Sequence, residues 1–418
     1  MQSCGLSANF NFHQNSPYYQ QLGADGKPRV FLVQKPVYGL RQAGRRFQCD
    51  FFAWFVLPIA DGGAGMSQCH HEPCIFVRRA GGETLYLGVY CDDIVAVYGR
   101  SYKGSVYSDF RDHLHTKWKA EDEGELNDIL NVRVSRIGSD VILDQAAYID
   151  AMVERFMPAG KLSSFKKYAP PFSLYFVRNI DAALALPPAS SHGYVPPDVV
   201  MLAAYQSIVG ALLYCSIVTR PDISYSVSML CCCMSRPTPA LLEEAYHVLG
   251  YLHHHREVGL RYSAALSEPW GHTDSNWATR RSTSGHTFHW QGCTIDWGST
   301  QQTSIALSSC EAEIMACSEA AQAVAYYRYL LEEIGFLPPG PTSLSMDNKA
   351  GIDLAYNPEH HKRTKHVERR HFFICEMIEA LKIWVPYIKS SDNLADFFTK
   401  PLPTRNFFRL RNLIMNIV

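Results

Sequence analysis

The chain has 418 residues, and 47% of them are hydrophobic. A single hydrophobic core stops growing at roughly 250 to 300 residues, so this length predicts two or three domains. The formal net charge is −1, which excludes a molecule-wide positive field, and any nucleic-acid binding must depend on local basic patches. No uninterrupted apolar stretch of about 20 residues is evident, so we expect a soluble protein without a membrane span.

The thirteen cysteines are odd in number and have no framework spacing, and residues 1–11 lack the basic and apolar parts of a signal peptide. These features predict a reducing compartment. The short run Cys69–Cys74 contains two cysteines and two histidines. Adjacent ligands rarely reach a tetrahedral zinc site without a second pair, so we expect no zinc there.

In the N-terminal part, β-rich runs precede a series of helical patterns. Residues 74–77 and 84–98, separated by two glycines, predict hairpin structure. Apolar residues at intervals of three and four predict a helix over 143–157, and the proline-rich residues 170–197 favour a linker or a long irregular loop. Further helices are predicted over 205–218, 223–234 and 240–255.

The C-terminal part begins with three predicted strands and then alternates helix and strand. This order indicates a mixed α/β sheet with helices packed on it. The predicted strands cover 271–277, 286–290, 293–297, 343–346 and 384–388. The predicted helices cover 309–334, 350–356, 367–381 and the residues from 393 onward.

Four acidic residues lie where predicted elements begin or end, namely Asp274, Glu313, Asp347 and Asp396. Ser308 and Glu311 have the spacing of a capping box, which starts a helix and leaves Glu313 free to point elsewhere. Carboxylates converge only if something offsets their repulsion, and two Mg²⁺ ions about 3.5 to 4 Å apart would do so while clamping a phosphodiester. Spacing alone leaves an alternative open, in which the four are unrelated caps and surface charges.

Five motifs in the same region resemble those of copia-type ribonuclease H and follow one another in that family's order. They are Gly271–Trp277 with Ser282–Gly285, Ala306–Glu313, Met346–Asn348, Arg363–Val367 and Asn393–Pro403. The resemblance implies cleavage of RNA in RNA–DNA hybrids, with the four acidic residues holding two Mg²⁺ ions. Two departures, Asn276 in place of a common Asp and Cys310 in place of a usual Thr, remove no predicted metal ligand.

The basic segment of this region contains Lys362, Arg363, Lys365 and His366. Beside an acidic metal site, we expect these residues to contact the phosphates of a hybrid duplex. The alternative is a solvated helix face, which is what a charge run of this size usually forms.

Further upstream, the adjacent carboxylates of Asp92 and Asp93 interrupt an apolar run. A buried pair of this kind would be costly without a counter-ion, and a bound metal would supply one. The alternative is a tight hairpin turn, in which Asp is common.

Tyr90–Asp93 resembles the polymerase hairpin of copia-type reverse transcriptase. Lys35–Phe47 resembles the segment of that enzyme that lies against the template and the incoming nucleotide. The resemblance therefore implies metal binding by Asp92 and Asp93, and nucleic-acid contact by Arg41, Gln42 and Arg45. It continues through the family's thumb and connection, at residues 143–156, 205–214, 219–223 and 234–238.

The resemblance also implies a further metal-binding aspartate before Lys35–Phe47, and the preceding residues contain only Asp25. We therefore expect polymerase activity to be lost, together with the fingers, and ribonuclease H activity to be retained. One alternative is a decayed, catalytically inactive transposon fragment that binds nucleic acid weakly. Another is that an upstream segment restores the polymerase.

The expected fold class is a multidomain α/β and α+β chain. It comprises a truncated reverse transcriptase palm at 1–120, a helical thumb and connection at 121–265, a ribonuclease H-like mixed-sheet α/β domain at 266–405, and a tail at 406–418. The resemblance implies RNA–DNA hybrid, RNA template and DNA as partners, with other Pol segments or a second Pol chain as further candidates and no membrane. It also implies a cytoplasmic location, within virus-like particles, and a nuclear stage.

Overall fold

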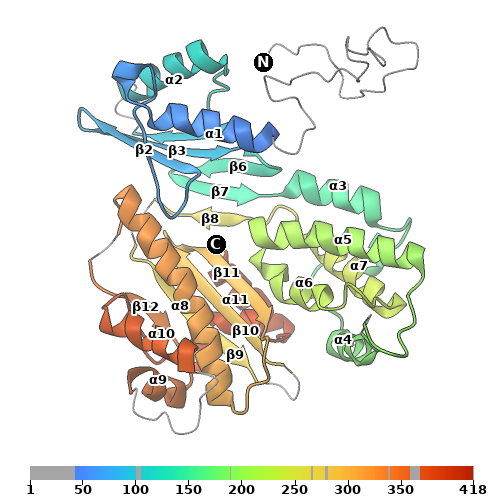
Figure 1. The fold of residues 1–418 in the computed structure, drawn as a ribbon. Coiled ribbons are helices and arrows are strands. Elements are labelled where there is room, and N and C mark those ends of the chain that lie inside the picture. The colour runs from blue at the N-terminus through green and yellow to red at the C-terminus, as the bar shows by residue number, and fades with distance from the viewer. Residues whose placement is uncertain are drawn as a thin grey trace, which may run out of the picture. The chain divides into compact units, whose positions relative to one another are not determined.

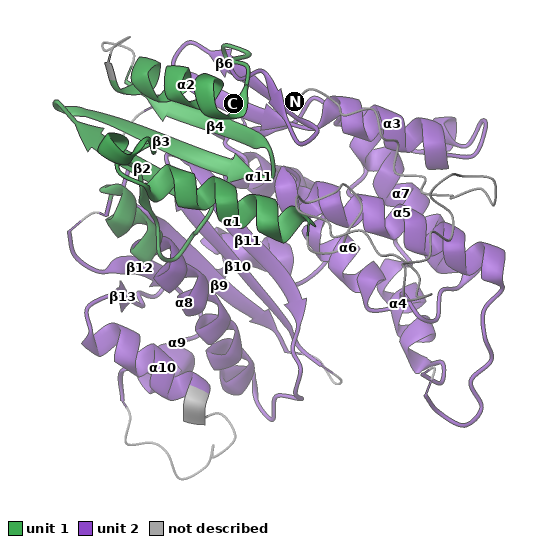
Figure 2. Cartoon of the chain, turned by 45° about the horizontal axis from the view of Figure 1, so that its top comes forward, with its two compact units in different colours: residues 1–125, 329–336 green, residues 126–328, 337–418 purple. Residues whose placement is uncertain are grey.

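The computed structural model describes residues 43–99, 105–188, 190–264, 267–277, 281–337, 339–357 and 368–417. The chain divides into two compact units, which are coloured separately in Figure 2. Unit 1 comprises residues 1–125 and 329–336, and unit 2 comprises residues 126–328 and 337–418. The expected division of the later part at residue 265 stays a prediction.

Unit 1 contains a four-stranded antiparallel sheet in the order β1-β2-β3-β4. Alternate residues of β3, namely Leu85, Leu87 and Val89, are buried and share a core with side chains of the two helices. The strands are β1 Ser67–Gln68, β2 Ile75–Ala80, β3 Glu83–Tyr90 and β4 Asp93–Tyr98, and the helices are α1 Ala43–Val56 and α2 Ser105–Trp118.

The expected hairpin structure over 74–77 and 84–98 is present but is divided differently. The first run continues to Ala80, and the second is two strands joined by a two-residue turn at Cys91 and Asp92. Cys91 has a φ of 54°, in the left-handed region that tight hairpin turns use. The run 84–98 is therefore a hairpin in itself.

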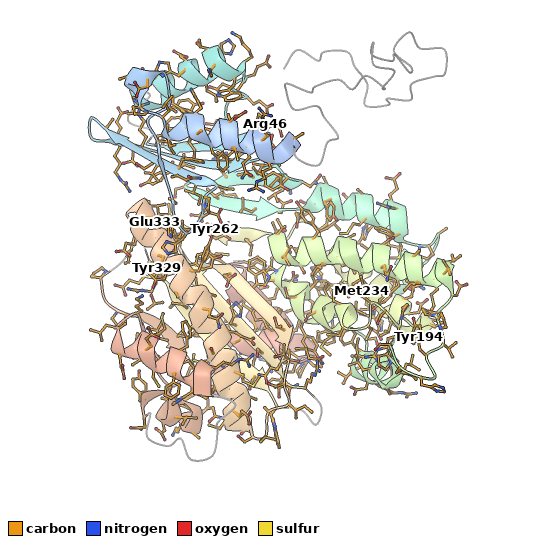
Figure 3. All side chains as sticks on the ribbon, in the orientation of Figure 1. Arg46, Tyr194, Met234, Tyr262, Tyr329 and Glu333 are labelled. Atoms are coloured by element: carbon orange, nitrogen blue, oxygen red, sulfur yellow. The ribbon has the colours of Figure 1, made fainter. Side chains whose placement is uncertain are left out.

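The end of helix α8 (Ser309–Ile334) belongs to unit 1, where Figure 3 labels Tyr329 and Glu333. The ring of His71 stacks on Tyr329 with centroids 4.5 Å apart. The Glu333 carboxylate accepts a hydrogen bond from the backbone N of His70 at 2.8 Å and pairs with Nδ1 of His71 at 2.5 Å. The run Cys69–Cys74 thus contacts a carboxylate and an aromatic ring.

Unit 2 begins with a four-stranded antiparallel sheet, in the order β5-β6-β7-β8, and five helices. The helices share one large core with strand β8. The strands are β5 Asp128–Ile129, β6 Val132–Ile137, β7 Asp140–Asp144 and β8 Leu260–Tyr262. The helices are α3 Ala146–Phe156, α4 Phe176–Ala185, α5 Val199–Val218, α6 Ser224–Cys231 and α7 Pro239–His254.

The expectation of an irregular linker over 170–197 is wrong in part, because α4 lies inside it. Phe176, Ile180 and Ala183 are spaced by four and three residues and are buried in the unit 2 core. The prolines that suggested a linker lie outside the helix. A short helix between proline-rich flanks is therefore stabilised by tertiary packing.

Helix α5 begins at Val199, earlier than expected, because the side chain of Asp198 caps it by accepting a hydrogen bond from the backbone N of Met201 at 2.9 Å. It is long enough, and with a mean hydropathy of 1.7 apolar enough, to cross a membrane, although Gln206 and Ser207 interrupt its apolar run. One such helix is weak evidence for a span. Ile208, Val209 and Leu212 pack in the unit 2 core.

A fully buried ion pair lies between α5 and α6, in the 3₁₀ helix Pro221–Ile223 and the residue before it. Nη2 of Arg220 lies 2.7 Å from Oδ2 of Asp222, and both side chains have no solvent exposure. Asp222 also accepts a hydrogen bond of 2.5 Å from the hydroxyl of Tyr251 in α7. Opposite charge and hydrogen bonds together compensate the burial of both ions.

The residues assigned to a tail at 406–418 lie mostly in helix α11 (Thr404–Ile414), which falls within the final helix expected from residue 393 onward. Phe407, Leu410 and Ile414 are buried in the unit 2 core. Arg411 donates a hydrogen bond of 3.4 Å to the hydroxyl of Tyr251, next to the buried ion pair. The apolar residues of this helix recur at intervals of three and four, which is the helical period.

The rest of unit 2 is built on a five-stranded sheet in the order β11-β10-β9-β12-β13. The first three strands pair antiparallel, and β12 and β13 join them in parallel. This is the expected mixed sheet. The strands are β9 Trp270–Asn276, β10 Thr283–Trp290, β11 Cys293–Gln301, β12 Thr342–Ser345 and β13 Ile383–Trp384.

Helix α8 has the bounds that the sequence predicts and lies across this sheet, as Figure 1 shows. Its residues Ile314, Cys317, Ala321 and Val324 are buried and share a core with Leu344 of β12. The remaining helices are α9 Lys349–Tyr356 and α10 Glu368–Glu379. The chain is thus the mixed α/β protein of several sheets that the sequence predicts.

Candidate metal centre

Three of the four predicted acidic residues converge in unit 2. One carboxylate oxygen from each of Asp274, Glu313 and Asp347 lies within 4.8 Å of the other two. Asp274 and Glu313 are 4% and 5% exposed, and Asp347 is half-buried. Burying unpaired carboxylates is costly, so the arrangement favours a bound cation.

Each ligand comes from a different element of the five-stranded sheet and its helices. Asp274 is in the central strand β9 and pairs in register with Gly285 of β10. Glu313 is in the first turns of α8, where the backbone N of Glu311 donates a hydrogen bond of 3.2 Å to the hydroxyl of Ser308. The predicted helix cap is therefore confirmed, with Glu311 in turn accepting from the backbone N of the residue before Ser308.

Asp347 lies two residues after the end of β12, whose parallel pairing with β9 brings the two carboxylates to the same end of the sheet. The next residue, Asn348, caps α9 by accepting a hydrogen bond of 3.0 Å from the backbone N of Gly351. A Cβ at Gly351 would lie 2.8 Å from Sδ of Met346 and 3.5 Å from Cβ of Glu313. A glycine at this position lets α9 begin close to the cluster.

Burial and mutual repulsion govern the ionisation of the cluster. Burial, followed by the charges of Asp274 and Asp347, raises the pKa of Glu313 to about 9. Burial, followed by the charge of Asp396, raises the pKa of Asp274 to about 7. A cation among these groups would favour their ionised forms.

Asp396 lies apart from the group of three and has its own counter-charge. It is in the 3₁₀ helix η6 (Leu394–Phe398), and its Oδ1 lies 2.8 Å from Nζ of Lys400. The neighbouring hydroxyl of Thr399 donates a hydrogen bond of 2.5 Å to Oδ2 of Asp274. The charge of Asp396 also raises the pKa of Asp274, so the two carboxylates are electrostatic neighbours.

The segment that carries Asp396 is fixed to the central strands. Nδ2 of Asn393 donates a hydrogen bond of 3.0 Å to the carbonyl of Thr273, and the backbone N of Leu394 donates one of 3.0 Å to Nδ1 of His272. A Cβ at Gly285 would lie 2.8 Å from the carbonyl of Ala395. Only a glycine allows η6 to pack this closely on β10.

The donor set fits Mg²⁺, which prefers carboxylate oxygens. Oε2 of Glu313 is buried and has no hydrogen-bond partner in the described part of the chain, so it is available as a ligand. The hydroxyl of Ser390 donates to Oδ2 of Asp347, as that of Thr399 does to Asp274. Such outer contacts orient ligands toward a metal.

Thr399, Lys400 and Ser390 were not singled out from the sequence. Lys400 follows Asp396 at a spacing of four residues, which is a signal for an ion pair on a helical segment. Ser390 and Asp347 are 43 residues apart, and no local pattern connects them.

The second predicted acidic site differs from the expectation in its exposure to solvent. Asp92 and Asp93 are both exposed at the tip of the β3–β4 hairpin of unit 1. The argument that a buried pair needs a metal is therefore wrong, because water solvates both carboxylates. Their metal-binding role now depends on the resemblance alone.

The predicted nucleic-acid contacts are mostly outside the described residues. Arg45 is exposed in the first turn of α1, where Figure 3 labels the neighbouring Arg46. Of the seven residues predicted to contact nucleic acid, Arg45 alone is among the described residues. Those outside the described residues are Arg41, Gln42, Lys362, Arg363, Lys365 and His366.

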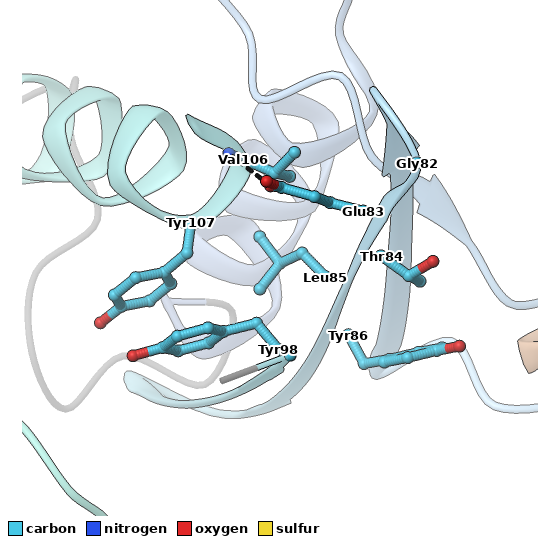
Figure 4. Close-up of a pocket in the computed structure, with 9 residues that line it drawn as sticks. Gly82, Glu83, Thr84, Leu85, Tyr86, Tyr98, Val106 and Tyr107 are labelled. Atoms are coloured by element: carbon cyan, nitrogen blue, oxygen red, sulfur yellow. Dashed lines mark hydrogen bonds between the residues drawn. The ribbon is translucent and has the colours of Figure 1, made fainter. Parts of the chain in front are cut away.

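Unit 1 has a cavity of about 260 Å³ beside β3 and α2, shown in Figure 4. The rings of Tyr98 and Tyr107 stack on one side of it, with centroids 4.2 Å apart. Glu83 accepts a hydrogen bond of 3.2 Å from the backbone N of Val106. None of the predicted site residues that the structure describes lines this cavity.

Residues 15–168 match the family model described as reverse transcriptase (RNA-dependent DNA polymerase). The chain is 27% identical over 398 residues to the retrovirus-related Pol polyprotein from transposon TNT 1-94 of Nicotiana tabacum, a match that covers 94% of this chain and 28% of the relative. It is 28% identical over 386 residues to the retrovirus-related Pol polyprotein from transposon RE1 of Arabidopsis thaliana, covering 90% of this chain and 24% of the relative. The chain thus spans about a quarter of the length of these relatives.

Among solved structures, LC11-RNase H1, isolated from compost by a metagenomic approach, is similar at 14% identity with a TM-score of 0.26. That match covers 32% of this chain and 92% of the solved chain. The sequence matches therefore show a reverse transcriptase-like segment at residues 15–168 within a longer similarity to Pol polyproteins. Over at least 90% of its length, the chain is similar to the Pol polyproteins of plant transposons, in agreement with the resemblance to copia-type elements.

Proposed function

We propose that unit 2 is a metal-dependent ribonuclease H that hydrolyses the RNA strand of RNA–DNA hybrids. The observation that supports this most is the convergence of Asp274, Glu313 and Asp347 from a central strand, a crossing helix and a parallel strand end. Asp396 is proposed as a fourth ligand, because its charge raises the pKa of the nearby Asp274 carboxyl.

When bound at these carboxylates, two Mg²⁺ ions would activate the attacking water and stabilise the leaving 3′ oxygen. Contacts within the chain hold the carboxylates in place before a metal ion binds. The hydroxyl groups of Thr399 and Ser390 orient Asp274 and Asp347, and the burial of Glu313 keeps its carboxylate away from bulk water. A pre-oriented ligand set lowers the reorganisation needed at the moment of reaction.

The test is cleavage of a labelled RNA–DNA hybrid by the purified chain with Mg²⁺. Asp274→Asn should reduce turnover by about a hundredfold or more, because it removes a ligand charge from the centre. Asp353→Asn, at an exposed position of α9, is the matched control and should retain turnover. Equal cutting by the wild type and Asp274→Asn, or equal cutting of single-stranded RNA, would reject the assignment.

The loss of polymerase activity is also a proposal, and primer extension by residues 1–418 tests it. Extension of a primer on an RNA template would overturn it. Folded protein that cuts no hybrid would support the alternative of a catalytically inactive transposon fragment. The cytoplasmic and nuclear locations that the resemblance implies belong to the same proposal.

A further inference from the structure

Lys400 places an ammonium group beside the candidate metal centre. Its Nζ lies 2.8 Å from Oδ1 of Asp396, and the side chain of Asp396 is only 14% exposed. The side chain of Lys400 is 41% exposed, so this ammonium is also in contact with solvent. An ion pair that is open to water on one side can separate at modest cost.

The ammonium acts on more than its immediate partner. Burial lowers the pKa of Lys400, but the hydrogen bond to Asp396 and the charges of Asp274 and Asp347 raise it, with a net rise. Conversely, the charge of Lys400 lowers the pKa of Asp274. One lysine therefore lies within electrostatic reach of three of the four predicted ligands.

The four predicted ligands differ in whether a cation of the protein already pairs with them. Asp274, Glu313 and Asp347 have their oxygens gathered, and among the described residues Oε2 of Glu313 has no hydrogen-bond partner. By contrast, the Asp396 carboxylate already pairs with an ammonium. A first divalent cation therefore belongs at the three gathered carboxylates, where it does not have to displace an ammonium.

We propose that Lys400 is a built-in cation that competes with a second Mg²⁺ ion for Asp396. The chain then binds one Mg²⁺ tightly at the three gathered carboxylates, and a second only when the ammonium leaves Asp396. This inference rests on the proposed function and deepens it, because it assigns a regulatory role at the same site. The anionic phosphodiester of a bound hybrid is the natural new partner for the released ammonium, since lysine binds phosphate as a point charge.

The test is calorimetric titration of the full chain with Mg²⁺ in the absence of nucleic acid. The wild type should show one tight site and a weaker second one. Lys400→Met should tighten the second site by about tenfold, within the range of roughly 5- to 150-fold that is typical of coupling between sites. Lys400→Arg keeps the charge and should behave as the wild type does.

The matched control is Lys161→Met, which removes an ammonium paired with Glu243 elsewhere in unit 2. Its Mg²⁺ isotherm should equal that of the wild type. Thermal unfolding of each variant checks that it is folded, which the exposure of Lys400 favours. An unchanged second site in folded Lys400→Met would overturn the inference.

Failure of the inference differs from failure of the proposed function. If the wild type cuts hybrid while Lys400→Met and the wild type bind Mg²⁺ identically, the role of Lys400 is rejected and the ribonuclease H assignment stands. If the wild type and Asp274→Asn give the same Mg²⁺ isotherm, both the role of Lys400 and the ribonuclease H assignment are rejected. Tighter binding of the second Mg²⁺ in Lys400→Met, but not in Lys400→Arg or Lys161→Met, supports both proposals.

Discussion

The hydroxyl of Thr399 donates a hydrogen bond of 2.5 Å to Oδ2 of Asp274, although the two residues are 125 positions apart in the chain. Asp274 is in the central strand of the five-stranded sheet, and Thr399 directly follows the 3₁₀ helix that carries Asp396. The hydrogen bond lowers the pKa of Asp274 against the effects of burial and of the Asp396 charge. It therefore connects the first and last acidic motifs directly.

Thr399→Val should destabilise unit 2, because it leaves a buried carboxylate oxygen of Asp274 without its donor. We expect a loss of about 1–3 kcal/mol in the free energy of unfolding, measured by urea denaturation. Thr399→Ser keeps the hydroxyl and should cost much less. A loss in Thr399→Ser as large as that in Thr399→Val would assign the effect to the methyl group.

Without metal, the stability of unit 2 should fall as the pH rises. The pKa of Asp274 is raised from 3.8 to about 7 and that of Glu313 from 4.5 to about 9, so the folded state binds more protons than the unfolded state across this window. The stabilisation is complete below about pH 4 and is lost as the pH rises through the folded values. We expect Tm in EDTA to fall by at least about 3 °C between pH 5 and pH 8.

Two controls accompany the pH measurement. Asp274→Asn should flatten the pH dependence and raise Tm at pH 8, because it removes one repelling charge. Mg²⁺ should also reduce the dependence in the wild type, since it favours the ionised carboxylates. A pH profile in EDTA that is the same for wild type and Asp274→Asn would contradict the repulsion within the cluster.

The buried pair of Arg220 and Asp222 should be sensitive to the loss of one partner. Asp222→Asn leaves an uncompensated guanidinium at a position without solvent exposure, and we expect a cost of about 3–5 kcal/mol in urea denaturation. The double variant Arg220→Met with Asp222→Leu removes both charges and should cost less than Asp222→Asn alone. A double variant that is less stable than the single one would show that the pair itself is net stabilising.

Gly285→Ala should weaken the contact between β10 and η6. The added Cβ would lie 2.6 Å from Cγ2 of Thr399 and 2.8 Å from the carbonyl of Ala395. Overpacking of this kind costs about 1–3 kcal/mol in the free energy of unfolding, and hybrid cleavage should fall with it because Thr399 moves from Asp274.

The matched control is Gly210→Ala, in α5, where a Cβ would meet nothing within 4 Å. Alanine is favoured over glycine in a helix, so this variant should be more stable by about 0.5–1 kcal/mol. Equal stability of the wild type and Gly285→Ala would show that η6 can shift without cost.

The sequence by itself determined the features that depend on local chemistry. Apolar spacing and the pair of Ser308 and Glu311 set the bounds of α8, and its buried stripe follows from the helical period. The order of strands and helices after residue 270 indicated the mixed sheet. Motif order identified the family and selected Asp274, Glu313, Asp347 and Asp396 among forty acidic residues.

Only the tertiary structure decided how these residues meet. It gathers three carboxylates, pairs Asp396 with Lys400, exposes Asp92 and Asp93, and buries α4 within a proline-rich segment. The physical reason is that burial and side-chain hydrogen bonds depend on contacts between residues far apart in the chain. Local sequence patterns carry no information about the distance between Thr399 and Asp274, and the packing of η6 on β10 sets that distance.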